Sequence, residues 1–178
     1  MDFQLSKELQ MLQKEIRNFA KKQIAPYVDE WDEKHYLPID EVMRPLGELG
    51  FFGTVIPEEY GGEDMGFLAA MIVTEELAKI SSSLRVQVNM QVLGCAYTIF
   101  RYGNDEVKKK YVEKLCTAEY IGGFGITESD AGSDVMAMAS TAEDKGDHWL
   151  LNGSKTWISN ANYADALLYY AYTDKAAG

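Results

Sequence analysis

Helical spacing of apolar residues over the first two-thirds of the chain is the feature that most limits its fold. Apolar side chains recur every three or four residues between positions 5 and 24, which predicts an amphipathic helix. Further helices are expected over 37–50, 67–80, 84–103 and 106–116. The β-branched residues of 84–103 are also compatible with a strand. We therefore expect residues 1–118 to form an all-helical domain.

Beyond residue 118 the pattern changes to short strand-like runs separated by turns. Glycines punctuate 120–128, and two hairpin signals follow, at Lys145–Asp147 and at Asn152-Gly153. The tyrosine-rich stretch 163–174 predicts one more strand. Four strands at most would leave a long open edge, which natural domains avoid. We expect residues 119–178 to be the first part of a β domain, and the sequence to be the front part of a longer protein.

The charge balance excludes several kinds of partner. The formal net charge is −11 and the isoelectric point is about 4.6, so no basic stripe is available for nucleic acid or an anionic membrane. No apolar run approaches the roughly 20 residues that span a bilayer, and the first residues show no targeting signal. Cys95 and Cys116 lie in apolar segments without zinc-site spacing, which indicates buried reduced thiols. We expect a soluble cytoplasmic protein without a metal site.

Two polar loops are the candidate binding elements. The stretch FGITESDAGSD (124–134) has the glycines and hydroxyls of a phosphate cradle but no Lys or Arg. The stretch NGSKTWISN (152–160) has a similar composition and adds a tryptophan. Plain structural roles compete with a binding role: Phe124 and Ile126 as core residues, Thr127 bonded to its own backbone, Trp157 as packing. The two loops are rich in backbone N–H groups and hydroxyls yet short of positive charge, and this leaves open which ligand they suit.

These two stretches, their spacing and the segment ELGFFGTVIPEEYGG (48–62) together resemble the acyl-CoA dehydrogenase family over all 178 residues. The resemblance implies an α+β fold, with an N-terminal helical domain followed by the first strands of a middle, β-barrel-like domain. It implies FAD as cofactor, an acyl-CoA substrate, an electron-transfer flavoprotein as partner and a homotetramer. The family's catalytic glutamate belongs to a C-terminal domain, so we expect no catalytic residue in this chain, and no activity from the chain alone.

The resemblance also assigns roles residue by residue. Thr127 would donate its hydroxyl to the flavin ring, and Trp157 would pack beside that ring. Gly132 and Ser133 would form a loop near the cofactor, with Ser133 touching the CoA portion of the substrate. The expected cofactor-binding residues are Phe124, Ile126, Thr127, Gly132, Ser133, Trp157, Ile158 and Ser159.

Arg85 is the residue most informative about the acyl group. It opens an otherwise apolar helix, in the region that lines the far end of the family's acyl pocket, and a guanidinium there can grip a carboxylate through two hydrogen bonds. Among family members the glutaryl-CoA dehydrogenases are the most similar. The expected substrate-binding residues are Arg85, Val86 and Ser133. In a structural role, Arg85 would instead reach solvent or pair with Glu75 or Glu76.

Two departures and several alternatives remain open at this stage. Decarboxylating glutaryl-CoA dehydrogenases have an acidic residue and a serine where this chain has Ala78 and Val86, which puts decarboxylation in doubt. The chain could also belong to a short-chain or aromatic acyl-CoA dehydrogenase. A flavin monooxygenase of the same fold, or a non-catalytic helical module, is a more distant alternative.

Overall fold

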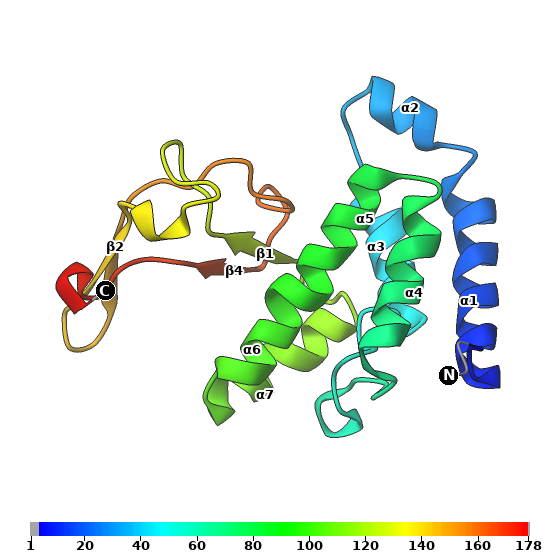
Figure 1. The fold of residues 1–178 in the computed structure, drawn as a ribbon, viewed down its shortest axis with the longest axis horizontal. Helices are drawn as coiled ribbons and strands as arrows, with labels where there is room; N and C mark the ends of the chain where they lie inside the picture. Colours follow the sequence, from blue (N-terminus) through cyan, green and yellow to red (C-terminus); the bar gives the residue numbers. More distant parts are fainter. Residues whose placement is uncertain (1–3, 178) are drawn as a thin grey trace.

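A computed structural model describes residues 4–177; residues 1–3 and 178, the outer ends of the two expected domains, lie outside it. Helices gather on one side of the molecule and short strands on the other (Figure 1). The helices are α1 (Lys7–Phe19), α2 (Val28–Glu33), α3 (Ile39–Glu48), α4 (Gly66–Ala78), α5 (Ser82–Asn89), α6 (Tyr97–Tyr102) and α7 (Asp105–Cys116). The strands are β1 (Gly122–Gly125), β2 (Thr141–Asp144), β3 (Trp149–Asn152) and β4 (Ala166–Tyr169).

The helices predicted from periodicity are confirmed, and their ends follow capping chemistry. Ser81 accepts a hydrogen bond from the Leu84 backbone N–H at the start of α5, and Asn104 accepts one from Val107 at the start of α7. The chain leaves α3 through Gly50, whose φ of +76° is the left-handed conformation that favours glycine. No described helix has both the length and the apolar character needed to cross a membrane.

The long segment predicted at 84–103 is one helix with an irregular middle. Helix α5 continues through a π-helical stretch, Met90–Ala96, directly into α6. The π-helical stretch contacts β1, and a Cβ on Gly94 would stand 3.4 Å from Phe124 Cβ. The strand alternative for this segment is therefore wrong, because residues 82–102 are helical throughout. This helix packs against the first strand.

The buried core is built almost wholly by the helical part. Its largest fully buried side chains include Ile16, Met43, Phe52, Leu77 and Leu115. Cys95 and Cys116 lie within this cluster as free thiols, and burial raises the pKa of each to about 12. The prediction of buried reduced cysteines is confirmed.

The strands form two small sheets instead of one. Strand β1 pairs in parallel with β4, with Gly122 opposite Ala166 and Gly125 opposite Tyr169. Strands β2 and β3 form an antiparallel hairpin whose turn lies at the predicted Lys145–Asp147 position. The second predicted hairpin, at Asn152-Gly153, is wrong: β3 ends at Asn152 and the chain enters an irregular loop that leads to β4. Figure 1 shows β1 and β4 between the helices and the β2–β3 hairpin.

One buried acid fastens α1 to α4. The Glu76 side chain is 2% exposed and accepts hydrogen bonds from Arg17 Nε at 2.9 Å and Arg17 Nη2 at 2.8 Å. Lys79 Nζ lies 2.8 Å from the same carboxylate. Hydrogen bonding from Arg17 lowers the pKa of Glu76 to about 2, against the penalty of burial.

We expect Glu76→Gln to change how stability depends on pH. Because the pKa of Glu76 falls from 4.5 to about 2 on folding, its contribution is present above pH 4.5 and is lost as the pH drops toward 2. Solvent around the half-exposed Arg17 limits that contribution to roughly 1–2 kcal/mol. Urea unfolding between pH 7 and pH 2 should show a flatter acid limb for the variant.

The neighbouring Glu75 offers a matched control. Its carboxylate is 62% exposed and pairs with Lys79 alone. Glu75→Gln should leave the acid limb close to that of the unmodified protein. An unchanged acid limb in Glu76→Gln would contradict the assignment.

Candidate functional site

The two polar loops lie side by side because the second loop runs along β1 and the start of the first loop, with Thr156 beside Thr127 and Asn160 beside Gly122. Strand β1 runs into the first loop, and the second loop precedes β4. The backbone N–H of Thr156 donates to the carbonyl of Thr127 at 2.9 Å, which joins the loops directly. Residues about 30 positions apart in sequence therefore form one surface.

A buried ion pair neutralises Lys155 and Glu128, whereas Asp130 and Asp134 of the first loop are exposed. Lys155 Nζ lies 2.7 Å from Glu128 Oε1, and the two side chains are 4% and 9% exposed. Glu128 also accepts hydrogen bonds from the backbone N–H groups of Ala139 at 2.7 Å and Ser140 at 3.0 Å. Hydrogen bonding from Lys155 is the largest of the causes that lower the pKa of Glu128 to about 2. The lysine of the second loop is thus committed to the glutamate of the first.

The hydroxyls on this surface remain available. Among the residues that the structure describes, neither the Thr127 hydroxyl nor the Ser159 hydroxyl has a hydrogen-bond partner. The structural alternative for Thr127, a bond from its hydroxyl to its own backbone, is therefore wrong. Both side chains are only partly buried, so their donors can reach a ligand.

Trp157 is the most exposed large apolar residue of the surface. It is 92% exposed and has a φ of +57°, a conformation that is costly for a bulky residue. The alternative in which Trp157 is packing is wrong within this chain. The exposed indole offers a flat, apolar face that a ligand can pack against.

The other predicted residues occupy several different environments. Phe124 is half-buried and its ring contacts Tyr170, with ring centroids 5.0 Å apart. Ile126 follows β1 and is half-buried, whereas Gly132 and Ser133 are exposed further along the same loop. The structure therefore brings Thr127 and the second loop together, and does not enclose Gly132 and Ser133 with them.

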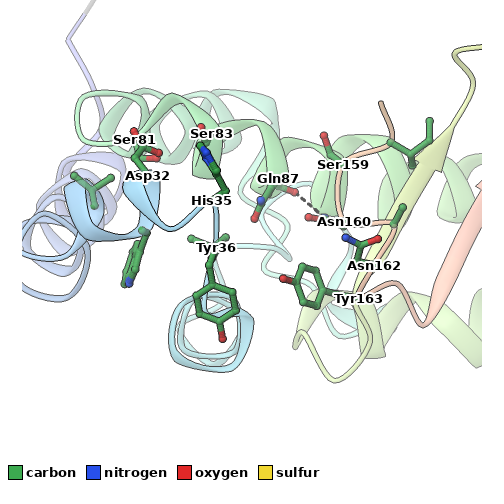
Figure 2. Close-up of a pocket in the computed structure, with 15 residues that line it drawn as sticks. Asp32, His35, Tyr36, Ser81, Ser83, Gln87, Ser159, Asn160, Asn162 and Tyr163 are labelled. Atoms are coloured by element: carbon green, nitrogen blue, oxygen red, sulfur yellow. Dashed lines mark hydrogen bonds between the residues drawn. The ribbon is translucent and has the colours of Figure 1, made fainter. Parts of the chain in front are cut away.

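A polar pocket of about 390 Å³ lies between the second loop, α2 and α5. Ile158 and Ser159 line it, as do Gln87 and Asn160 (Figure 2). Figure 2 also shows His35 and Tyr36 on the side of α2. Sequence reasoning gave Gln87 and Asn160 no role, although Asn160 directly follows Ser159 in the quoted motif.

Arg85 lines a second pocket, of about 480 Å³, on the α4 side of α5. The other lining residues include Leu68, Met71, Ile72 and Ala78. Among the described residues, the Arg85 guanidinium makes no hydrogen bond or ion pair.

The expected structural partners of Arg85 are already engaged elsewhere. Glu76 pairs with Arg17 and Lys79, and Glu75 pairs with Lys79 at 2.8 Å. The alternative in which Arg85 pairs with either glutamate is therefore wrong. The half-buried guanidinium is free either to meet solvent, the other expected structural role, or to bind a carboxylate that enters the pocket. Val86, the other expected substrate residue in this helix, is half-buried.

Comparison with known families matches both parts of the chain. Residues 6–119 match the family "Acyl-CoA dehydrogenase, N-terminal domain". Residues 123–178 match the family "Acyl-CoA dehydrogenase, middle domain". The chain is 74% identical to glutaryl-CoA dehydrogenase of Desulfococcus multivorans, over 100% of this chain and 46% of that protein. It is 38% identical to mitochondrial isovaleryl-CoA dehydrogenase of Bos taurus, over 97% of this chain and 41% of that protein. The chain thus spans about half the length of these relatives.

Solved structures give the same picture. A glutaryl-coenzyme A dehydrogenase in complex with glutaryl-CoA superposes with a TM-score of 0.97 at 74% identity, over 100% of this chain and 46% of that one. A chain from a study of the electron transferring flavoprotein of Acidaminococcus fermentans gives 0.95 at 38% identity, over 100% and 47%. An FAD complex of PigA gives 0.90 at 29% identity, over 98% and 46%.

Glu128→Gln should loosen the two loops together. The substitution keeps the shape of the side chain but leaves the buried Lys155 ammonium without a counter-charge. Hydrogen exchange should accelerate across 126–128 and across 154–159, and the melting temperature should fall.

Glu143→Gln provides the control, because Glu143 pairs with Lys145 on the exposed hairpin, where the two side chains are 60% and 39% exposed. Its exchange and melting should stay close to those of the unmodified protein. Loosening of only one loop in Glu128→Gln would show that the ion pair does not couple them.

Proposed function

The chain belongs to the acyl-CoA dehydrogenase family, and from this we propose that it is part of an FAD-dependent enzyme that oxidises the α,β bond of glutaryl-CoA. The single observation that carries the choice of substrate is the uncommitted guanidinium of Arg85. The identity of 74% to glutaryl-CoA dehydrogenase of Desulfococcus multivorans supports the same choice. A short-chain monocarboxylic substrate would leave Arg85 without a partner.

The surface formed by the two loops suits an oxidised flavin ring. That ring is flat and neutral and presents hydrogen-bond acceptors along one edge. The surface offers an exposed aromatic side chain, Trp157, and two free hydroxyls, and its lysine, Lys155, is neutralised by Glu128. The chemistry that FAD supplies when bound in this family is acceptance of the hydride that leaves the acyl β-carbon.

We propose the following contacts between residues of this chain and the flavin ring. Trp157 and Ile158 cover one face of the ring, and Phe124 and Ile126 line its edge. The hydroxyls of Thr127 and Ser159 donate hydrogen bonds to it, and such donors stabilise negative charge that develops during reduction. Gly132 and Ser133 hold the loop near the cofactor, with Ser133 toward the CoA portion of the substrate.

Arg85 orients the substrate from its far end. A glutaryl chain presents a carboxylate that must lose its hydration on entering a pocket lined by Leu68, Met71 and Ile72. The guanidinium replaces that hydration with two parallel hydrogen bonds. Binding at both ends of the acyl chain fixes the α and β carbons against the flavin-facing surface.

We further propose that the distal carboxylate is retained, so that glutaconyl-CoA is the product. Ala78 lines the Arg85 pocket and Val86 follows Arg85 on the same helix, so neither an acidic side chain nor a hydroxyl stands at these positions. Mass analysis of the thioester formed from glutaryl-CoA by the protein that the complete gene encodes tests both proposals. Crotonyl-CoA would refute the second proposal alone, and no turnover would refute the first.

The remaining features are proposed for the complete protein, with the assembly and the electron acceptor carried over from the family. We propose that the enzyme is cytoplasmic, assembles as a homotetramer and passes its electrons to an electron-transfer flavoprotein. Analytical ultracentrifugation tests the assembly. Reduction of a purified electron-transfer flavoprotein in the presence of glutaryl-CoA tests the partner.

Thr127→Val should preserve the fold but weaken FAD binding or slow flavin reduction. The substitution removes one hydrogen bond to a developing charge, a loss of about 1.5–3 kcal/mol, or roughly 10- to 150-fold. Stopped-flow reduction and FAD titration measure the effect. The exposed Thr173→Val is the control, and unchanged rate and affinity in Thr127→Val would show that Thr127 does not face the ring.

Arg85→Gln should damage glutaryl-CoA oxidation far more than butyryl-CoA oxidation. The two chains present the same α and β carbons, and they differ in the carboxylate that loses its partner. Removing one partner of a buried charge pair costs about 3–5 kcal/mol, so kcat/KM for glutaryl-CoA should fall by roughly two to four powers of ten.

Arg101→Gln is the matched control, because Arg101 is an exposed arginine on α6. It should leave kcat/KM for both thioesters unchanged. Equal losses on the two thioesters in Arg85→Gln would make Arg85 a structural residue and overturn the dicarboxylate assignment.

A further inference from the structure

Three segments of the chain meet at Gly122, the first residue of β1. Its backbone N–H donates to Gln91 Oε1 at 2.7 Å, and its carbonyl accepts from Asn160 Nδ2 at 3.0 Å. A Cβ at this position would lie 2.6 Å from the Cβ of Cys95, so only glycine allows the strand to approach the helix this closely. The start of β1 is thus held on both sides by side-chain amides.

Asn160 extends this junction to the second loop and to α5. Its Nδ2 also donates to the carbonyl of Gln87 at 3.3 Å, an interaction drawn in Figure 2. The residue is 5% exposed, and its own Oδ1 has no partner among the described residues. The φ of Asn160 is +66°, which asparagine tolerates better than most residues. Among the described residues the Asn160 side chain therefore acts only as a hydrogen-bond donor, to two carbonyls from different segments.

The two hydrogen bonds of the Asn160 side chain join the two parts of the proposed site, the helix that carries Arg85 and the loop that faces the flavin. Gln87 stands two residues after Arg85 on α5. Asn160 directly follows Ser159, at the end of the loop that carries Trp157. A single carboxamide therefore connects the helix that carries the carboxylate receptor with the loop that faces the flavin.

We propose that Asn160 is a positioning residue that fixes the separation between Arg85 and the flavin-facing loop, and so selects the length of the dicarboxylic acyl chain. The proposal rests on the proposed function. A chain with one methylene too few or too many cannot place its carboxylate at Arg85 and its α,β bond at the flavin at the same time. One methylene more or less in an apolar pocket changes kcat/KM by about 10- to 200-fold.

The test separates the amide of Asn160 from its backbone conformation. Asn160→Gly keeps the positive φ without strain and removes both hydrogen bonds. Asn160→Asp keeps the shape but turns a charged acceptor toward two carbonyls. Asn162→Gly is the control, because Asn162 is an exposed asparagine of the same loop. All are made in the protein that the complete gene encodes, loaded with FAD.

The first measurement is kcat/KM for succinyl-, glutaryl-, adipyl- and butyryl-CoA. In Asn160→Gly and Asn160→Asp, the preference for glutaryl-CoA over adipyl-CoA should fall by about tenfold or more, while butyryl-CoA, which does not use Arg85, should change little. The control should keep the preference of the unmodified enzyme. An unchanged preference, or equal losses on all four thioesters, would overturn the proposal.

The second measurement does not depend on activity. Hydrogen exchange of Asn160→Gly should accelerate at 157–163 and also at 85–90, because the amide holds both segments. Acceleration in the loop alone would overturn the proposal. If Asn160→Gly does not fold, Asn160→Ser, which retains one shorter donor, is subjected to the same two measurements and the same criteria.

Different results would refute the proposed function and the proposed role of Asn160. An unmodified enzyme that oxidises butyryl-CoA but none of the dicarboxylic thioesters refutes the proposed function before any variant is made. An unmodified enzyme that prefers glutaryl-CoA, with variants that keep this preference, refutes the role of Asn160 alone.

Discussion

The carboxamide of Gln91 is the interaction on which the relation between the helices and the strands depends. Its Nε2 donates to the carbonyls of Leu115 and Tyr120, each at 2.8 Å, and its Oε1 accepts from Gly122 N–H. The residue is fully buried, so each of these polar groups would otherwise be left without water or partner, at about 1–3 kcal/mol apiece. The end of α7, the turn after it and the start of β1 are thereby fixed to one helix.

Two candidate binding sites lie around this junction, the surface of the two loops and the pocket beside Arg85, and ion pairs determine the free charges in each. In the loop surface Lys155 is neutralised by Glu128. Beside Arg85, Arg17 and Lys79 pair with Glu76 and Glu75, so the Arg85 guanidinium has no ion-pair partner among the described residues. In both places an ion pair decides which charged side chains remain free.

Local patterns predicted the features that depend on neighbours in sequence. Periodicity located the long helices, and capping residues such as Ser81 and Asn104 were readable from the sequence. The hairpin at Lys145–Asp147 was predicted because its two strands are adjacent. The same logic failed at Asn152-Gly153, since a turn signal cannot reveal that the following strand pairs with β1 instead of β3. The family motifs identified Thr127 and Trp157, but no local pattern shows that Glu128 and Lys155 meet across 27 positions.

Contacts between residues far apart in the sequence also decide the ion-pair partners near Arg85. The sequence identified Arg85 as a candidate residue, but only the structure shows whether Glu75 or Glu76 pairs with it. In the sequence Arg85 lies ten residues after Glu75 and nine after Glu76, so a salt bridge to either glutamate is a reasonable expectation. Excluding that pair requires knowing that Arg17, 59 positions before Glu76, reaches it first across the α1–α4 contact. Because Glu76 is 2% exposed and bound through two parallel hydrogen bonds, it cannot also serve Arg85 without giving up a better partner. That Glu76 is not available to Arg85 is therefore a consequence of how the first helix packs, far from the pocket itself.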